Sequence, residues 1–259
     1  MFMDDSVIVF RYPIILFVVS FLVLWLSAHT GRLLARALHV RLTEHIEVLA
    51  VIQGATLTLL GLIIGFSFSM ALGRYDQRKN YEEEEANAIG TEYLRADFLP
   101  EGAAADVRRQ LRDYLDLRIE YYTTRGMEQL DDINLRTGAT QSKLWATIRG
   151  PVAAQPTTVL ALVAAGMNDV LNTQGYTQAA WLNRIPAAAW ALLSAIAICA
   201  TMLLGLGAKK TVPSRIQPVL PLVISIAFFL IADIDSPRRG VIRVVPQNLV
   251  SLAQSLRAP

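Results

Sequence analysis

An uncharged stretch at residues 48–73 contains a regular series of small and hydroxyl side chains. They follow one another at steps of four, three, four and four, which places them on one helical face: Gly54, Thr58, Gly61, Gly65 and Ser69. In a membrane helix such a stripe lets neighbouring helices approach closely, or it lines a path for water and ions. Ser69 could face such a path or bond its own backbone, and Gln53 could line the mouth or hydrogen-bond across helices. The stretch favours a channel or transporter subunit over an enzyme.

Charged residues follow directly after this stretch. Arg74, Arg78 and Lys79 are expected either to anchor at lipid headgroups or to pair with carboxylates one turn later. Four consecutive glutamates then cover a full helical turn: Glu82, Glu83, Glu84 and Glu85. They predict either a solvated helix face or a ring of carboxylates that attracts cations in a water-filled vestibule.

The rest of the sequence argues against several classes of function. A net charge of +2 gives no case for nucleic-acid binding. The single cysteine, Cys199, cannot form an internal disulfide, and no Cys/His spacing typical of a metal site occurs. There is no nucleophile elbow, phosphate-binding glycine loop or zinc-protease motif, and no carboxylate sits alone in an apolar stretch. We therefore expect no enzymatic activity, metal or cofactor.

Four uncharged runs predict the elements that hold these residues. Hydrophobic residues make up 53% of the chain, and the runs lie at residues 12–30, 48–73, 185–208 and 216–232. Each is long enough to cross a bilayer, which takes about 20 residues, though the last run is short. Asp4 and Asp5 precede the first run, which favours a retained span over a signal peptide. The fold class is therefore an all-α membrane protein, with four transmembrane helices in two hairpins.

The polar insertion at residues 74–184 is expected to be helical. Apolar side chains recur there at helical spacing: Val107, Leu111, Tyr114, Leu115, Ile119 and Tyr122. Residues 77–99 predict a second helix ended by Pro100, and residues 157–178 a helix capped by Thr157 or Thr158. Gly126, Gly138, Gly150-Pro151 and Pro156 are expected to be breaks. The predicted parts are a first hairpin at 1–73, a helical domain at 74–184, a second hairpin at 185–235 and a tail at 236–259.

Three ordered elements resemble bestrophins. Gly65-Phe66 followed by Arg74-Tyr75-Asp76-Gln77-Arg78-Lys79 is similar to their second span, and Leu182-Asn183-Arg184-Ile185-Pro186 to the start of their third. Ile231-Ala232-Asp233-Ile234-Asp235-Ser236-Pro237 resembles the acidic element after their last span. Residues 85–90 (Glu-Ala-Asn-Ala-Ile-Gly) and Asp235-Ser236-Pro237-Arg238 look still closer to an uncharacterised bacterial bestrophin-like branch. The resemblance covers roughly residues 48–246.

The resemblance implies specific roles. It implies a homopentamer around one pore in the inner (plasma) membrane, with the insertion and both termini cytosolic. Basic residues alone divide almost evenly between the two sides, so the topology rests on this resemblance. Carried over, the pore neck comprises Thr58, Leu62 and Phe66, with Gly61 and Gly65 beside them. Leu and Phe rings can narrow a pore and close it by dewetting, or these side chains could only pack against lipid or helices.

The sequence departs from the bestrophin pattern in two places, and two other functions compete with the channel prediction. Tyr75 and Asp76 stand where bestrophins usually carry paired tryptophans, and the acidic calcium clasp is reduced to Asp233 and Asp235. These two aspartates are expected either to end a helix or to form a cation-binding or gating element. The predicted function is an oligomeric channel for inorganic ions in a lipid bilayer. The alternative is a non-conducting, membrane-anchored scaffold or sensor whose cytosolic helices bind a partner; a small-solute transporter is a weaker third.

Overall fold

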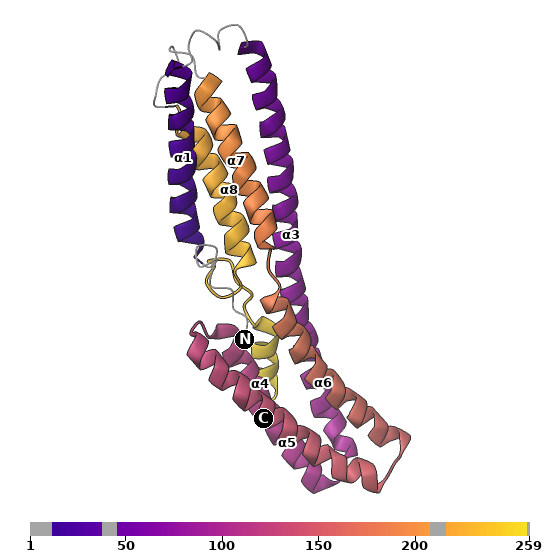
Figure 1. Cartoon of the computed structure of the whole chain (residues 1–259). Helices are drawn as coiled ribbons and strands as arrows, with labels where there is room; N and C mark the ends of the chain where they lie inside the picture. The colour runs from indigo at the N-terminus through magenta and orange to yellow at the C-terminus, as the bar shows by residue number, and fades with distance from the viewer. Residues whose placement is uncertain (1–11, 38–45, 208–215, 258–259) are drawn as a thin grey trace. The chain divides into compact units, whose positions relative to one another are not determined.

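The computed structural model describes residues 12–37, 46–207 and 216–257, and all regular structure within these ranges is helical. The elements, in order, are α1 (Pro13–Ala37), α3 (Ile46–Arg95), the short η3 (Ala96–Phe98), α4 (Glu101–Thr123), α5 (Met127–Ala154), α6 (Thr158–Leu182), α7 (Ala187–Gly207), α8 (Val219–Asp235) and α9 (Gln247–Ser255). Figure 1 shows them along the chain. The expectation of an all-α protein without a sheet is confirmed for these residues.

The chain forms two compact units. The first, which we call the apolar unit, comprises residues 1–74 and 184–243, and the second, the helical unit, comprises residues 75–183 and 244–259. Helix α3 contributes its first part to the apolar unit and its second part to the helical unit. The separate second helix expected from Gln77 is a wrong prediction, because α3 continues through this region as one helix of 50 residues.

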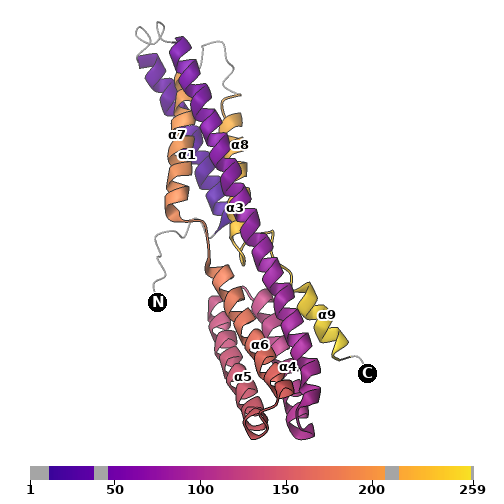
Figure 2. The ribbon, with the colours of Figure 1, turned by 90° about the vertical axis from the view of Figure 1, so that its right-hand side faces the viewer.

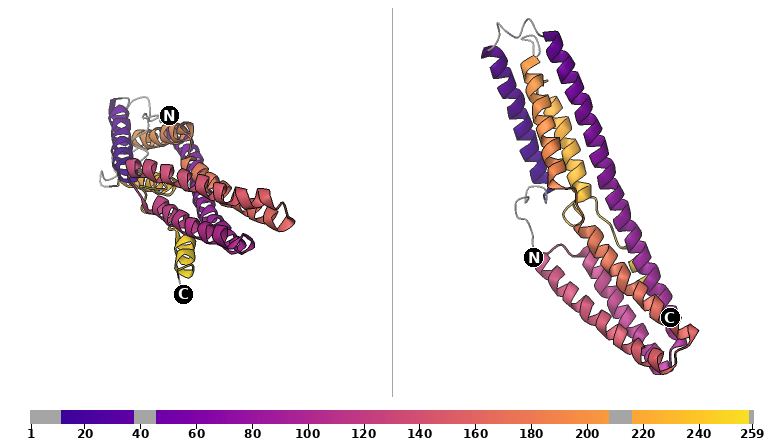
Figure 3. Two further views of the ribbon diagram at one scale, coloured as in Figure 1. Left: turned by 90° about the horizontal axis from the view of Figure 1, so that it is seen from below. Right: turned by 45° about the vertical axis from the view of Figure 1, so that its right-hand side comes forward.

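In the apolar unit, α1 lies against both α7 and α8 (Figures 1 and 3). Glycine makes the contact between α1 and α7 close: a Cβ at Gly31 would overlap the carbonyl oxygen of Met202, and one at Gly205 that of Ala28. Ser27 also donates a hydrogen bond of 2.9 Å to the carbonyl of Ile198. Small residues at such positions are typical of helix packing inside membranes.

Three helical segments among the described residues are long and apolar enough to cross a membrane. They are α1, a part of α3, and a part of the region from α6 to α7. Helix α8 is also strongly apolar but has 17 residues. The two loops that would close the predicted hairpins, around residues 38–45 and 208–215, lie outside the described residues.

The helical unit has its own apolar core. The stripe predicted on α4 is confirmed: Val107, Leu111, Tyr114, Leu115 and Tyr122 are buried, and Ile119 packs against them. Facing residues come from α3, α5 and α6, and the amphipathic α9 adds Leu249 and Ala253. Figure 2 shows α9 beside α3. A core drawn from five helices allows this unit to bury apolar surface without a membrane.

The helix ends in this unit agree with some of the caps and breaks predicted from the sequence and disagree with others. Thr157 caps α6, because its hydroxyl accepts a hydrogen bond of 3.2 Å from the N–H of Leu160, as predicted. Gly126 precedes α5 as expected. The breaks expected at Gly138 and Gly150-Pro151 are wrong, since α5 continues through both. A proline in the last turn removes one N–H only, and the N–H of Gln155 still bonds the carbonyl of Pro151 at 3.1 Å.

Candidate functional site: the exposed face of helix α3 and the charged residues below it

The three predicted neck residues share one face of α3, and that face is open. Leu62 is 55% exposed and Phe66 is 63% exposed, although both are large apolar side chains. Thr58 is exposed too, but its hydroxyl donates a hydrogen bond of 2.9 Å to the carbonyl of Gly54 and so is satisfied by its own helix. Leu60, Ser67 and Ala71 are buried, on a different part of the helix surface. No other described part of this chain covers the face that carries Leu62 and Phe66.

Three glycines in the apolar part of α3 are not needed for packing within the chain. A Cβ built at Gly54, Gly61 or Gly65 would meet no other described atom within 4 Å. This contrasts with Gly31 and Gly205, where a Cβ would overlap backbone atoms. Of the two remaining candidates, Ser69 is exposed, and the side-chain oxygen of half-buried Gln53 lies beside Gly207 of α7.

The two aspartates at the end of α8 are hydrogen-bond acceptors that join separate segments. Asp235 accepts hydrogen bonds from the N–H of Ile185, at 3.1 and 3.3 Å, and forms an ion pair with Arg74 at 3.3 Å. It thereby links α3, the segment before α7 and the end of α8. Asp233 accepts from the N–H groups of Val241 and Ile242 at 2.7 and 2.8 Å. This holds the segment after α8 against the helix end.

These contacts favour a structural role for both aspartates over cation binding. Their oxygens already accept from peptide N–H groups and a guanidinium, which compensates their charge. Within residues 12–37, 46–207 and 216–257 there is no group of three or more His, Cys, Asp or Glu side chains that could hold a metal ion. A role of Asp233 and Asp235 in gating stays a prediction.

After the apolar stretch in the sequence, α3 carries charged side chains that are buried in the helical unit. Arg78, which was expected at headgroups or paired with glutamate, is 1% exposed. Its Nε and Nη2 atoms donate to the carbonyls of Ala180 and Asn183 at 3.2 and 3.3 Å. The last carbonyls of a helix have no partner inside it, and a cation there also interacts favourably with the helix dipole. Arg78 therefore caps the end of α6.

Glu82 serves the start of α9 in the same way. Its carboxylate accepts a hydrogen bond of 2.9 Å from the N–H of Leu249 and one of 2.6 Å from the side-chain amide of Asn248. Pro246, which stands before α9, offers no side-chain cap. An acidic side chain from α3 thus supplies the acceptor that the first turn of α9 lacks.

Glu85 lies at the centre of a buried network. It forms an ion pair with Arg118, and its other oxygen accepts from the hydroxyls of Tyr122 and Thr177, each at 3.3 Å. Burial and the negative charge of Glu85 raise the pKa values of Tyr114 and Tyr122. Burial is the largest single influence on the pKa of Arg118 and lowers it, but the charge and hydrogen bond of Glu85 together with Tyr114 and Tyr122 raise it, and the net shift is upward, so this arginine stays charged.

The four consecutive glutamates therefore divide into two pairs. Glu82 and Glu85 are buried and hydrogen-bonded, which does not fit a ring of carboxylates around water. Glu83 and Glu84 are exposed, so only these two remain candidates for lining a vestibule. The sequence interpretation missed the pairing because each partner lies far away along the chain, on α4, α6 or α9.

Comparison with known proteins identifies the family. The bestrophin-like domain matches residues 14–249 of the chain. The chain belongs to the bestrophin-like family. No curated protein matches it in sequence.

Solved structures of bacterial bestrophin homologues share the fold. One single-residue mutant of a Klebsiella pneumoniae homologue is 14% identical, with a TM-score of 0.64 and 93% of each chain covered. A second mutant of that homologue is 13% identical, with a TM-score of 0.63, covering 93% of this chain and 97% of the other. The resemblance inferred from Gly65-Phe66 and Asp235-Ser236-Pro237 is confirmed at the level of the family. At these identities, the likeness concerns the fold alone.

Proposed function

We propose that this bestrophin-like protein is the subunit of an oligomeric ion channel, with α3 lining the pore. The observation that carries the proposal is the open face of α3, where Leu62 and Phe66 are exposed beside glycines that the chain itself does not pack. Large exposed apolar side chains on a membrane-length helix must meet lipid, another subunit or a pore. Glycine at Gly61 and Gly65 leaves room for neighbouring helices to approach.

The proposed pore narrows at Thr58, Leu62 and Phe66. In a symmetric assembly each residue forms a ring, and Leu and Phe rings form a hydrophobic constriction that closes when it loses water. Family membership supports a homopentamer in the inner membrane, with the helical unit and both termini in the cytosol. Glu83 and Glu84 would then lie near the cytosolic mouth and favour cations over anions. Ser69 and Gln53 stay candidates for the pore wall or for helix packing.

The proposed topology includes α8 as a fourth span. Its 17 residues rise about 25 Å at about 1.5 Å per residue, which is near the lower limit for crossing a bilayer. Under this proposal residues 1–73 and 185–235 form the two membrane hairpins, residues 74–184 the cytosolic helical domain and residues 236–259 the cytosolic tail. Membership of a channel family supports a transport function over catalysis.

Ion flux into liposomes that contain the purified protein tests the proposal. Phe66→Ala should widen the constriction and raise the flux above the wild-type rate. Phe68→Ala is the matched control, because Phe68 is also exposed but lies two positions further along the helix, on a different face. Equal flux in the wild type and Phe66→Ala would remove Phe66 from the gate.

A non-conducting scaffold or sensor is the second candidate. The observation that favours it is the presence of exposed apolar side chains in the helical unit, where Leu94, Leu135 and Leu182 are each at least two-thirds exposed. Such side chains suit a protein partner. A scaffold would tolerate leucine at Gly61 and Gly65 without loss of partner binding, whereas a channel built on this face would lose assembly or flux. Absence of flux in both wild type and Phe66→Ala would favour the scaffold.

A further inference from the structure

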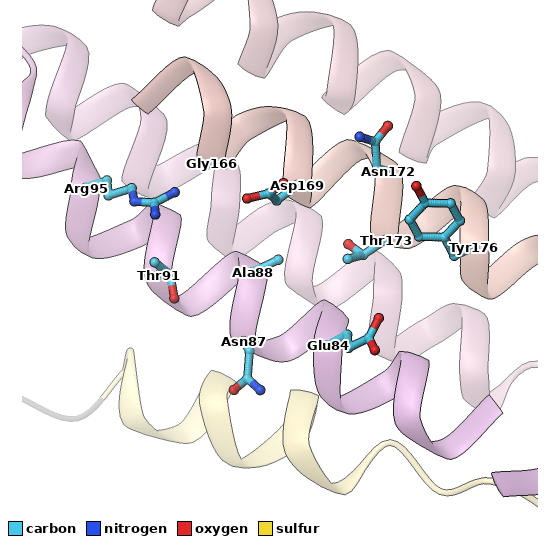
Figure 4. A pocket seen from close by; sticks show the side chains of 10 residues that line it. All are labelled: Glu84, Asn87, Ala88, Thr91, Arg95, Gly166, Asp169, Asn172, Thr173 and Tyr176. Atoms are coloured by element: carbon cyan, nitrogen blue, oxygen red, sulfur yellow. The ribbon is translucent and has the colours of Figure 1, made fainter. Parts of the chain in front are cut away.

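The helical unit contains a polar pocket beside α3 and α6, and apart from Glu84 its lining residues play no part in the proposed pore. Its volume is about 440 Å³. Figure 4 shows the carboxylate of Asp169 and the guanidinium of Arg95 directed toward one another at the Gly166 end, with Glu84 further along the pocket. The other lining side chains are mostly amides and hydroxyls from Asn87, Thr91, Asn172, Thr173 and Tyr176.

A buried carboxyl group adjoins this end of the pocket. Glu92 is 0% exposed, and neither of its carboxyl oxygens has a hydrogen-bond partner among the described residues. Its closest cation is Arg95, whose Nη1 lies 3.9 Å from Oε2, beyond hydrogen-bonding distance. Gly166 makes this arrangement possible, because a Cβ there would overlap both Oε2 of Glu92 and Nη1 of Arg95.

Other charged groups near this turn of α3 are already engaged. The guanidiniums of Arg108 and Arg112, from α4, lie over the ring of Tyr93, and Arg108 also forms an ion pair with Asp97 of η3. Two turns earlier in α3, Glu85 is paired with Arg118. The charged groups that act on Glu92 itself are therefore Arg95 from α3 and Asp169 from α6.

Burial and these two charged groups together set the pKa of Glu92, and burial has the largest effect. Burial raises the pKa of the Glu92 carboxyl most, Arg95 lowers it, and the negative charge of Asp169 raises it again, to about 8. Glu92 lies well beyond the apolar stretch of α3 that ends at Gly73, in the part of the helix that belongs to the helical unit.

We propose that Glu92 is a proton-binding site that makes the packing of α3 against α6 respond to pH in the neutral to alkaline range. The protonated carboxyl is neutral and fits its buried place. Loss of the proton leaves a buried carboxylate without a hydrogen bond, and it draws the guanidinium of Arg95, its nearest cation at 3.9 Å, toward it. The guanidinium of Arg95 then moves toward Glu92, and the Gly166 end of the pocket carries one more negative charge. The inference concerns the helical unit and does not depend on ion conduction.

The stability of the protein should change with pH in a defined direction. The pKa of Glu92 is raised on folding, from 4.5 to about 8. The folded state therefore holds a proton that the unfolded state releases, and this contribution to stability is lost as the pH rises through that interval. Between pH 6 and pH 9 the unfolding temperature of the full-length protein should fall further in the wild type than in Glu92→Gln, which keeps the shape of the neutral acid.

Infrared spectroscopy of the full-length protein in lipid nanodiscs tests the site directly, by following the C=O band of protonated carboxyl groups with pH. The wild type should lose one band with a midpoint near 8. Glu92→Gln should lack that band, and the control Glu84→Gln should retain it. Asp169→Asn should lower the midpoint, and Arg95→Gln should raise it.

Two results would overturn the inference. One is a wild-type spectrum without a carboxyl band that titrates above pH 7, or with such a band that persists in Glu92→Gln. The other is a midpoint that moves in the same direction in Asp169→Asn and Arg95→Gln, which would show that these two groups do not act on the titrating carboxyl. Unequal flux among the variants bears only on conduction, so a failed channel assay leaves this test intact.

Discussion

The two parts of α3 obey opposite rules of burial. In the apolar part, Leu62 and Phe66 are exposed. In the charged part, Arg78, Glu82, Glu85 and Glu92 are buried. Both parts show the opposite of a water-soluble helix, in which apolar side chains normally face the core and charged side chains face solvent. The described chain therefore leaves this face of the first part exposed, whereas it buries the charged residues of the second part.

Three buried charged side chains in the second part of α3 form hydrogen bonds or ion pairs with other helices. Arg78 caps the end of α6, Glu82 caps the start of α9, and Glu85 pairs with Arg118 of α4. Burying a charge is costly unless it is paired and hydrogen-bonded. Glu92, which has no hydrogen bond, is the exception on this helix. The charged part of α3 therefore organises the helical unit, and the face of its apolar part that carries Leu62 and Phe66 is left exposed by the described chain.

Removal of one partner of the buried ion pair should have the largest effect on the stability of the helical unit. Arg118→Ala should lower the free energy of unfolding by about 3–5 kcal/mol, because Glu85 is then left buried and unpaired. Urea unfolding followed by circular dichroism measures the change. The control Arg136→Ala, whose pairs with Glu120 and Asp132 are exposed, should cost about 0–1 kcal/mol. Equal losses in both variants would contradict a special role for the buried pair.

Glycine substitutions compare the packed and open faces of the apolar unit. Gly31→Ala should destabilise the protein by about 1–3 kcal/mol, because the new Cβ overlaps the carbonyl of Met202. Gly61→Ala meets open space and should not destabilise the single chain. Its effect should fall on assembly, as a weaker oligomer in native mass spectrometry. A destabilised Gly61→Ala monomer would show that the face is packed within the chain.

Removal of the cap on α9 should have a smaller, local effect. Glu82→Ala should cost about 1 kcal/mol and release the C-terminal helix, because Leu249 and Asn248 lose their acceptor. Limited proteolysis should then cut near α9 faster than in the wild type. Glu83→Ala, on the same turn but exposed, is the control and should leave the cleavage rate unchanged. If cleavage near α9 is as slow in both variants as in the wild type, Leu249 and the apolar core alone hold this helix in place.

The smallest expected effect on stability concerns the exposed face itself. Leu62→Ala removes a side chain that no described part of the chain covers, so the free energy of unfolding of the separated subunit should change by about 0.5 kcal/mol or less. Ion flux should rise, since the ring of side chains at this level becomes wider. A large loss of subunit stability in thermal unfolding would place Leu62 in an intrachain core and contradict the open face.

The sequence predicts those parts of the molecule that depend on local patterns. The buried stripe of α4, the cap at Thr157 and the absence of strands among the described residues follow from spacing and capping rules. The family follows from short ordered motifs around Gly65-Phe66 and Asp235. Expected breaks fail at Gly138 and Gly150-Pro151, because packing of α5 against α4 and α6 outweighs local helix-breaking tendencies.

The buried charges could not be predicted from spacing alone. Glu85 and Arg118 are 33 residues apart, and Glu82 and Leu249 are 167 residues apart. A run of glutamates on a helix is usually solvated, so the pattern pointed to the surface. One signal was available in retrospect: Arg78, Glu82, Glu85 and Glu92 recur at helical spacing together with Ile89, which indicates that this charged stripe faces the core.

Cryo-electron microscopy of the full-length protein in lipid nanodiscs tests the central claim most directly, because it reports both symmetry and the direction of the open face. The account predicts a five-fold ring in which Thr58, Leu62 and Phe66 point toward the axis, and in which Gly61 and Gly65 meet a neighbouring subunit. A monomer, or an assembly in which these three side chains face lipid and no axial path exists, would contradict it.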